Sequence, residues 1–137
     1  MSKSQETYIK YRFKRAEESF DDAQIMIEKH SWNSAVNRLY YACFYAVIAL
    51  LLKKGLDVRS HEGARIKFSD EFVKTGLIDL KFGRLFNKLS DYRNKGDYAD
   101  LFDFDQETVL PLVDQVKDFI TEIRTMIENN NLPITRR

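Results

Sequence analysis

The sequence predicts an all-α protein, an antiparallel bundle of four to five helices. Glycine and proline are scarce, with five and two in 137 residues, and no Asn-Gly or Asp-Gly pair marks a hairpin. Apolar residues recur at helical spacing along most of the chain. The stretch from Leu39 to Leu52 carries no charge, yet it is shorter than the ~20 residues of a membrane span. We therefore expect it to form the buried central helix of the bundle.

The first two helices are expected in residues 1–54. Five apolar residues, spaced three or four apart, form one face of the first helix: Phe13, Ala16, Phe20, Ala23 and Ile27. A second helix is expected to begin near Ser31 or Asn33, because either residue can cap it with a side-chain oxygen. It is expected to run to Lys54, before Gly55.

Two further helices are expected in the middle of the chain. Ser60 can cap a short helix from His61 to about Lys74, closed by Gly76. Five apolar residues at helical spacing outline a fourth helix: Phe82, Leu85, Phe86, Leu89 and Tyr92. This helix is expected to end near Lys95, with Gly96 as a left-handed stop.

The last helix is expected to start between Asp105 and Thr108. Pro111 favours this start, because the missing N–H of a proline costs least in the first turn. The inward side of this helix is apolar: Leu112, Val113, Val116, Phe119, Ile120, Ile123, Met126 and Ile127. We expect these residues to pack it against the other helices.

Composition and charge exclude several classes of protein. The 22 Lys and Arg residues nearly balance the 21 Asp and Glu residues, for a net charge of +1, so any nucleic-acid site must be a local patch. A single cysteine, Cys43, rules out a disulfide framework or a zinc site of several thiolates, and its apolar neighbours favour a buried thiol. The chain starts without an apolar signal-peptide core. We expect one soluble, cytoplasmic domain over residues 1–137, with a core at about 8–128, frayed ends and no membrane partner.

Residue spacing predicts no metal or cofactor site. The chain has no glycine-rich phosphate loop, and His61 lacks a second histidine four positions on. The acidic residues that follow Asp91 fit a calcium loop only at Gly96, because an arginine and a lysine fall on ligand positions. We therefore expect no cofactor and no tightly bound metal.

The first unusual stretch lies on the central helix, where Arg38 precedes three tyrosines, Tyr40, Tyr41 and Tyr45. Buried tyrosine hydroxyls need hydrogen-bond partners, so a purely aliphatic core would not require them. The commoner use of such aromatics is packing between helices or in a dimer. The alternative is a pocket wall on which a base stacks, with Arg38 and Tyr41 as binding residues.

The second unusual stretch is Asp91–Tyr98. Arg93 and Asn94 stand at the expected end of the fourth helix. A turn there would return Asp97 and Tyr98 toward them. Arginine suits phosphate, because its planar guanidinium donates paired hydrogen bonds. The commoner alternative is a structural ion pair between Arg93 and Asp97 at i, i+4.

These stretches, in this order, resemble the HEPN domain, in its branch of small stand-alone bacterial and archaeal proteins. The resemblance covers about residues 8–128 and lies in the order and spacing of several pieces: Arg15-Ala16, Ala23, Trp32–Ala35, Arg38–Ala46, Leu50-Leu51 before Gly55, Ser60–Gly63, Phe68, Phe72–Gly76, Arg93–Tyr98 and Phe119-Ile120. It implies a bundle of four or five helices, usually a homodimer, paired with a minimal nucleotidyltransferase in a toxin–antitoxin system.

The resemblance also implies a catalytic site. Active relatives look like metal-independent RNases built on an arginine, a polar residue, three further positions and a histidine, with two sites facing each other across the dimer. Arg93 matches the arginine and Asn94 the polar residue. The histidine position holds Tyr98, preceded by Asp97. Tyrosine and aspartate titrate near ~10 and ~3.9, so neither replaces a histidine, at ~6.5, as a proton shuttle. His61 is the only other candidate for that histidine, but it lies at the start of a different helix and is expected to be a surface or capping residue.

Three classes of function remain. The first is a HEPN-like module, weakly catalytic or non-catalytic, that dimerises and binds a nucleotide, RNA or a nucleotidyltransferase through Arg93, Arg38 and Tyr41. The second is a metal-independent RNase toxin with an altered site of Arg93, Asp97 and Tyr98. The third is a structural helical interaction protein without a ligand. The missing histidine favours the first class over the second, and the retained arginine favours it over the third.

Overall fold

The computed structural model describes residues 3–98 and 103–129, without the side chains of residues 96–98. Five α-helices and one π-helical segment follow one another along these residues: α1 (Lys3–Glu28), α2 (Trp32–Lys53), α3 (His61–Phe68), η1 (Ser69–Val73), α4 (Leu80–Tyr98) and α5 (Gln106–Glu128). The described residues contain no strand. The predicted all-α class is therefore confirmed.

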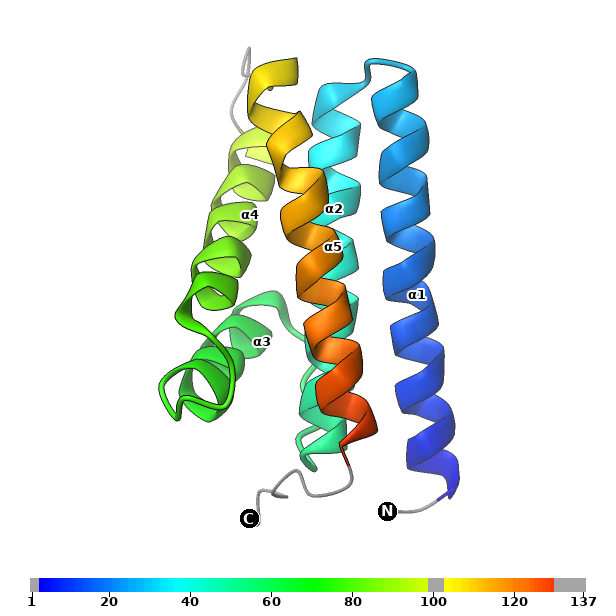
Figure 1. Cartoon of the computed structure of the whole chain (residues 1–137), viewed down its shortest axis with the longest axis vertical. Helices are drawn as coiled ribbons and strands as arrows, with labels where there is room; N and C mark the ends of the chain where they lie inside the picture. The colour runs from blue at the N-terminus through cyan, green and yellow to red at the C-terminus, as the bar shows by residue number, and fades with distance from the viewer. Residues whose placement is uncertain (1–2, 99–102, 130–137) are drawn as a thin grey trace.

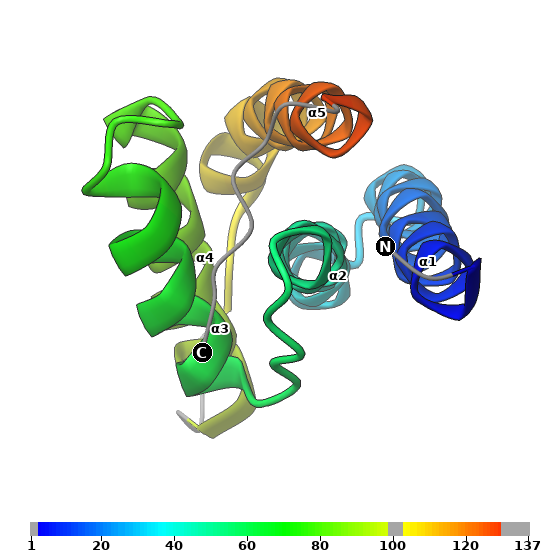
Figure 2. The same ribbon diagram turned by 90° about the horizontal axis from the view of Figure 1, so that it is seen from below.

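The four long helices form an antiparallel bundle (Figure 1). In the view of Figure 1, α1 and α4 run upward along the chain, while α2 and α5 run downward. Seen from below, α2 lies at the centre, and α1, α5 and the pair of α3 and α4 surround it (Figure 2). Side chains from all of these elements therefore meet on α2.

α2 is the core helix because apolar residues cover nearly its whole circumference. Every residue from Ala42 to Leu52 is buried except Tyr45. The helix is long and apolar enough to cross a bilayer, but 78% of its apolar stretch is buried inside the bundle. Burial by neighbouring helices is the usual reason for an apolar surface on all sides of a helix in a globular core.

Of the predicted helix caps, Ser60 is confirmed and Ser31 is wrong. The Ser60 hydroxyl accepts a hydrogen bond from the Gly63 N–H at 3.0 Å, and the Asp105 carboxylate accepts one from the Thr108 N–H at 2.8 Å. Ser31 occupies the cap position of α2 but makes no side-chain cap hydrogen bond. The start of α3, with His61 as its first residue, is thus fixed by a cap that was readable from the sequence.

Asn33, the other expected cap of α2, holds the segment before α5 instead. Its side-chain oxygen accepts a hydrogen bond from the Phe104 N–H at 2.8 Å, and its nitrogen donates one to Asp103 at 3.3 Å. Phe104 is buried, with its ring centre 5.1 Å from that of Tyr92 on α4. The beginnings of α2 and α5 are therefore tied to the second half of α4.

Several element boundaries differ from the sequence-based expectation. α1 already begins at Lys3, within the segment expected to fray. α3 ends at Phe68 and passes into η1, which ends at Val73. The predicted stop at Gly96 is wrong, because α4 continues through it to Tyr98. An interior glycine costs a helix only about 1 kcal/mol, so a glycine alone does not end one.

Pro111 also lies deeper in its helix than predicted. The start of α5 at Gln106 agrees with the expectation, but Pro111 is its sixth residue and falls in the second turn. Its side chain is exposed. The carbonyl left without its helical N–H partner therefore lies near the exposed side of the first turns, where water can solvate it.

The buried Lys54 anchors η1 to the end of α2. Its ammonium lies 3.3 Å from the Glu71 carboxylate and donates a hydrogen bond to the Glu71 carbonyl at 3.1 Å. It also lies 4.9 Å from the centre of the Phe72 ring. Because η1 continues α3, this contact fixes the position of α3 relative to α2.

Candidate functional site

Arg93 projects from α4 toward the aromatic face of α2. Its guanidinium carbon lies 5.4 Å from the centre of the Tyr40 ring and 5.8 Å from that of Tyr41, within cation–π range. Arg38 lies over the same Tyr41 ring at 4.9 Å. The three residues predicted to form a binding wall are thus brought together, with Tyr41 in contact with both arginines.

Each of the three tyrosines of α2 has a polar or cationic partner within the chain. Tyr40 contacts His61, Tyr41 contacts the two arginines, and Tyr45 lies under Arg15 of α1 at 5.4 Å. Buried tyrosines need such partners for their hydroxyls and rings. The aromatic face of α2 is therefore occupied inside the bundle, which agrees with the helix–helix packing interpretation.

His61 lies beside Arg93, although the two residues are far apart in the sequence. Its Nδ1 is 2.7 Å from the Tyr40 hydroxyl, and its ring stacks on Phe44 with centroids 4.5 Å apart and planes 28° apart. The side chain is half-buried. The expected role as a surface or capping residue is wrong, since the cap is Ser60 and the imidazole points inward to α2.

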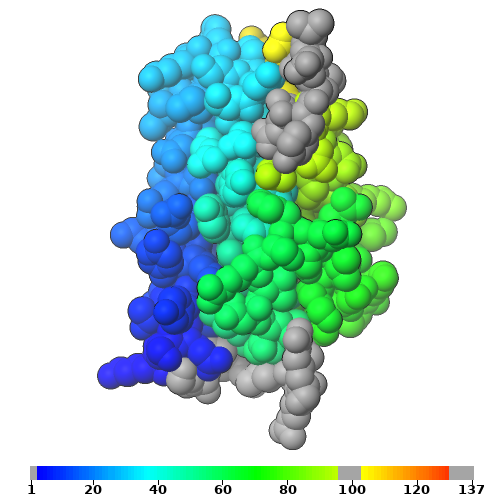
Figure 3. Space-filling view, turned by 180° about the vertical axis from the view of Figure 1, so that it is seen from behind, coloured from blue at the N-terminus to red at the C-terminus, as the bar shows by residue number. Residues whose placement is uncertain are grey.

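These side chains line a pocket of about 350 Å³ between α2, α3 and α4, which we call the Arg93 pocket. Its walls are formed by eight residues: Tyr40, His61, Glu62, Arg65, Ile66, Ser90, Arg93 and Asn94. Figure 3 shows the face of the molecule on which the cyan atoms of α2 lie between those of α1 and the green atoms of α3 and α4. The pocket thus combines two arginines, an imidazole and one aromatic ring, that of Tyr40.

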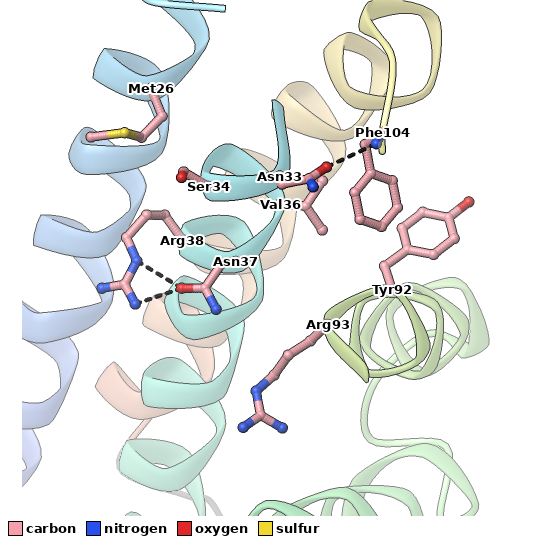
Figure 4. Close-up of a pocket in the computed structure, with 9 residues that line it drawn as sticks. All are labelled: Met26, Asn33, Ser34, Val36, Asn37, Arg38, Tyr92, Arg93 and Phe104. Carbon is pink, nitrogen blue, oxygen red and sulfur yellow. Dashed lines mark hydrogen bonds between the residues drawn. The ribbon is translucent and has the colours of Figure 1, made fainter. Parts of the chain in front are cut away.

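A second hollow, of about 410 Å³, lies on the other side of Arg93 and reaches Arg38. Figure 4 shows Arg93 extending from α4 toward α2, while Arg38 is turned away and bonded to Asn37. The two Arg38–Asn37 hydrogen bonds measure 3.1 and 2.6 Å. Arg93 lines both hollows, whereas Arg38 lines the second hollow and not the Arg93 pocket.

The remaining sequence candidates follow Arg93 on the same helix. Asn94 is exposed and lines the Arg93 pocket. The expected turn that would return Asp97 and Tyr98 toward Arg93 is wrong, because the backbone stays helical through Tyr98. The side chains of Asp97 and Tyr98 lie outside what the structure describes, so their catalytic role stays a prediction.

Burial and charge shape the titration of the pocket. Burial raises the pKa of Tyr40 to about 12, so its hydroxyl keeps its proton at neutral pH. Burial, and then the positive charge of Arg93, lower the pKa of His61 below its ordinary 6.5. The neutral imidazole is therefore the dominant form of His61 near pH 7.

This arrangement makes a testable prediction about pH. Arg93→Gln should raise the pKa of His61 yet leave it below 6.5, because burial is the larger cause of the shift. The imidazole signals followed by heteronuclear NMR against pH measure this directly. Arg84→Gln, an exposed arginine on α4, is the matched control and should leave the titration unchanged. Identical titrations in wild type and Arg93→Gln would contradict the contact between the two residues.

The lowered pKa of His61 also determines how its contribution to the stability of the fold changes with pH. The unfolded chain binds a proton at His61 near pH 6.5, whereas the folded chain binds it only at a lower pH. Between these two values the unfolded state holds more protons, so the contribution of His61 to stability falls as the pH falls.

Two other sequence-based expectations concern Cys43 and metals. Cys43 is fully buried, and burial raises the pKa of its thiol far above the usual range, which confirms a structural thiol. Among residues 3–98 and 103–129, no three His, Cys, Asp or Glu side chains are placed to hold a metal ion together.

Comparison with known proteins places this fold and pocket in a family. A HEPN domain profile matches residues 9–126, from the first turns of α1 to the last turn of α5. The chain belongs to the HEPN family. It is 40% identical to a UPF0332 protein of Thermotoga maritima. The 124 aligned residues make up 90% of this chain and 94% of that protein.

Two further HEPN relatives come from Methanocaldococcus jannaschii. One, named "Putative toxin MJ0142", is 28% identical over 118 residues, or 86% of this chain and 80% of that protein. The other, named "Putative toxin MJ0605", is 39% identical over 84 residues, or 61% of this chain and 63% of that protein. The HEPN resemblance seen in the sequence is thus confirmed, and the chain is similar to proteins of toxin type.

His61 is the residue of this HEPN domain that sequence reasoning considered as the other candidate histidine but set aside as a surface or capping residue. The signal was present, since Ser60–Gly63 is one of the pieces on which the resemblance rests. The one-dimensional pattern does not show which pieces meet in space. The fold brings the start of α3 against Tyr40 and Arg93, and so places a histidine in the pocket from another helix.

Proposed function

We propose that this HEPN protein is the toxin-type module of a toxin–antitoxin pair and that it binds RNA in the Arg93 pocket. The observation that carries the proposal is the Arg93 guanidinium, half-buried over two tyrosine rings at a pocket lined by further polar groups. The toxin names of two relatives support the toxin-type setting.

The chemistry of the pocket suits an RNA phosphate. An arginine donates paired hydrogen bonds to phosphate oxygens, and its contacts with Tyr40 and Tyr41 limit the side-chain freedom that binding would otherwise remove. Arg65 adds a second positive charge at the rim, where Asp91 lies 3.9 Å from it. The volume of about 350 Å³ falls in the range usual for ligand sites, about 300–1,000 Å³.

The half-buried ring of Tyr41 beside the arginine favours a nucleic acid over a free phosphate. Single-stranded RNA is bound by stacking its bases on aromatic side chains while basic groups hold the backbone. The net charge of +1 predicts modest, local affinity without a broad electrostatic field. From the HEPN resemblance we also propose that the protein forms a homodimer and that its partner is a minimal nucleotidyltransferase.

The proposal predicts that Arg93→Ala weakens RNA binding by about tenfold or more. A charge-assisted hydrogen bond contributes about 1.5–3 kcal/mol, and 1.4 kcal/mol is a factor of ten in affinity. Fluorescence anisotropy with a short, single-stranded 2′-O-methyl RNA measures binding alone, because this probe lacks the hydroxyl that self-cleavage needs.

Arg84→Ala is the matched control for that measurement. It removes the same charge from an exposed site on α4 that lies outside the Arg93 pocket, so it should leave the affinity nearly unchanged. Equal losses of RNA affinity in the two variants would show that the net charge of the protein, and not the position of Arg93, causes the effect. No binding by the wild-type protein, or an Arg93→Ala protein that binds normally, would refute the proposed function.

A further inference from the structure

Aromatic rings continue along α2 beyond the Arg93 pocket. The Tyr41 ring, whose centre lies 5.8 Å from the guanidinium carbon of Arg93, is followed one turn later by Tyr45, with the two ring centres 5.8 Å apart. Neither ring is fully covered, since both side chains are half-buried. In Figure 3 the cyan atoms of α2 reach the surface between those of α1 and the green atoms of α3 and α4. An aromatic edge of α2 therefore begins beside Arg93.

α1 adds an arginine and two exposed tyrosines to this edge. The guanidinium carbon of Arg15 lies 5.4 Å from the centre of the Tyr45 ring. Tyr11 is four residues before Arg15 and Tyr8 is three residues before Tyr11, so the helical repeat places them on one stripe of α1. Tyr8 and Tyr11 are 56% and 58% exposed, more than any other large apolar side chain among the described residues. We define the tyrosine strip as Tyr41, Tyr45, Arg15, Tyr11 and Tyr8.

The strip runs in one direction away from Arg93, because α1 and α2 are antiparallel (Figure 1). On α2 it leads toward the end of the helix, and on α1 it leads back toward the start, so both halves are directed downward in Figure 1. On the opposite side of Arg15, the same stripe of α1 continues with Glu18, whose carboxylate repels a phosphate. A polyanion is therefore favoured only on the side of Tyr8.

We propose that single-stranded RNA held in the Arg93 pocket continues along the tyrosine strip, so that the ligand of this protein is an oligonucleotide and not a mononucleotide. Its bases stack on the exposed tyrosine rings while Arg15 binds a backbone phosphate, which is the combination by which proteins hold single strands. The inference rests on the proposed function, because the strand enters the strip from the Arg93 pocket. It adds the length of the ligand and the direction in which the strand leaves the pocket.

Arg15 is the cation of the strip that is available to a phosphate. Arg12, on the neighbouring stripe of α1, is buried and pairs with Asp57 at 3.1 Å, and Arg59 pairs with the same carboxylate at 3.3 Å. Arg15 is exposed and contacts the Tyr45 ring. A guanidinium has five N–H donors, so contact with one tyrosine leaves donors for phosphate oxygens.

A nucleic acid fits this strip better than a second protein chain does. The core of a protein interface is depleted in charged residues. Here Arg15 lies in the middle of the strip, and Arg38 lies 4.9 Å from the centre of its first ring, that of Tyr41. Rings beside arginines are typical of single-strand binding, because every base has a face that stacks. The positive charge of the arginines complements the phosphates of the backbone.

The first test measures fluorescence anisotropy with two 2′-O-methyl RNAs, a trinucleotide that occupies the pocket and a dodecamer that also reaches the strip. Tyr11→Ala should weaken binding of the dodecamer about fivefold or more, the effect of losing one stacked base, and leave binding of the trinucleotide unchanged. The Tyr11 side chain is 58% exposed, so its removal opens no cavity in the core. Tyr11→Phe keeps the ring and is the conservative control, which should bind both RNAs like the wild type.

The second test measures how the affinity for the dodecamer changes with salt. Arg15→Gln should reduce the slope of log affinity against log salt concentration by about 0.7, the contribution of one phosphate contact to single-strand binding. Lys14→Gln is the matched control, because it removes the same charge from the preceding residue of α1. Lys14 lies on a different side of the helix, that of Glu17, which pairs with Arg124 of α5 at 2.8 Å. Its slope should equal that of the wild type.

Several results would overturn the inference. If folded Tyr11→Ala protein binds the dodecamer as tightly as the wild type, the RNA does not follow the strip, while loss of affinity in Arg93→Ala still supports the proposed function. Equal changes of the salt slope in Arg15→Gln and Lys14→Gln would show that Arg15 makes no phosphate contact of its own. A change from dimer to monomer in Tyr11→Ala, seen by light scattering without loss of dodecamer affinity, would make the strip an interface between copies of this chain. Failure of the wild-type protein to bind either RNA would refute both proposals.

Discussion

Phe119→Ala is expected to lower the free energy of unfolding by about 3–5 kcal/mol, the usual cost of removing a buried phenyl ring. Phe119 on α5 is fully buried and contacts three other rings, Phe68, Phe82 and Phe86, at centroid distances of 5.7, 5.8 and 6.2 Å. These rings come from α3 and α4, so no single neighbour can move to fill the cavity.

The size of this loss is large relative to the whole stability of a small domain, about 5–15 kcal/mol. Urea unfolding followed by circular dichroism measures it, and the melting temperature should fall by about 10 °C or more. Leu110→Ala is the matched control, since Leu110 lies on the same helix with 41% of its surface exposed. Equal losses in both variants would contradict the packing of α5 described above.

Glu71→Ala is expected to cost about 3 kcal/mol, the lower end of what breaking a buried ion pair costs. The substitution leaves the ammonium of Lys54, whose side chain is 7% exposed, without its carboxylate. The cost stays at the lower end because Lys54 keeps its hydrogen bond to the Glu71 carbonyl and its contact with the Phe72 ring.

A second substitution separates the buried charge from simple loss of packing. Lys54→Met in the Glu71→Ala background removes the unpaired charge and keeps an apolar stem, so it should restore most of the lost stability. Asp70→Ala is a control, because its ion pair with Lys74 lies on the surface and should contribute about 0–1 kcal/mol. A double variant no more stable than Glu71→Ala would show that the charge is not the cause.

Local features of the sequence were sufficient for the helices. The apolar spacing from Phe13 to Ile27 lies in α1, Ser60 caps α3 as expected, and α5 begins at Gln106, within the expected range. The errors arose where one residue was given more weight than its environment. Gly96 does not end α4, and Ser31 makes no cap hydrogen bond. Cap and stop signals act within one turn, and packing against other elements overrides them.

The residues of the candidate site also fall into those that the sequence identified and those that required the fold. The sequence determined Arg93, Arg38 and Tyr41, because an arginine at a polar helix end and an aromatic stretch on an apolar helix stand out without knowledge of the fold. It offered His61 only as the other candidate for the missing histidine and favoured a surface or capping role. A histidine that follows a capping serine is read as a surface residue unless its distant neighbours are known.

Only the tertiary structure decided that His61, Tyr40 and Arg93 meet. They come from three helices, and their proximity depends on how α3 packs against the central α2 and on the Lys54 contact that holds η1. Helical periodicity fixes which face of a helix is buried, because it is a local property of the backbone. Which polar groups face one another across a pocket depends on packing between helices distant in sequence, and no local pattern contains that information.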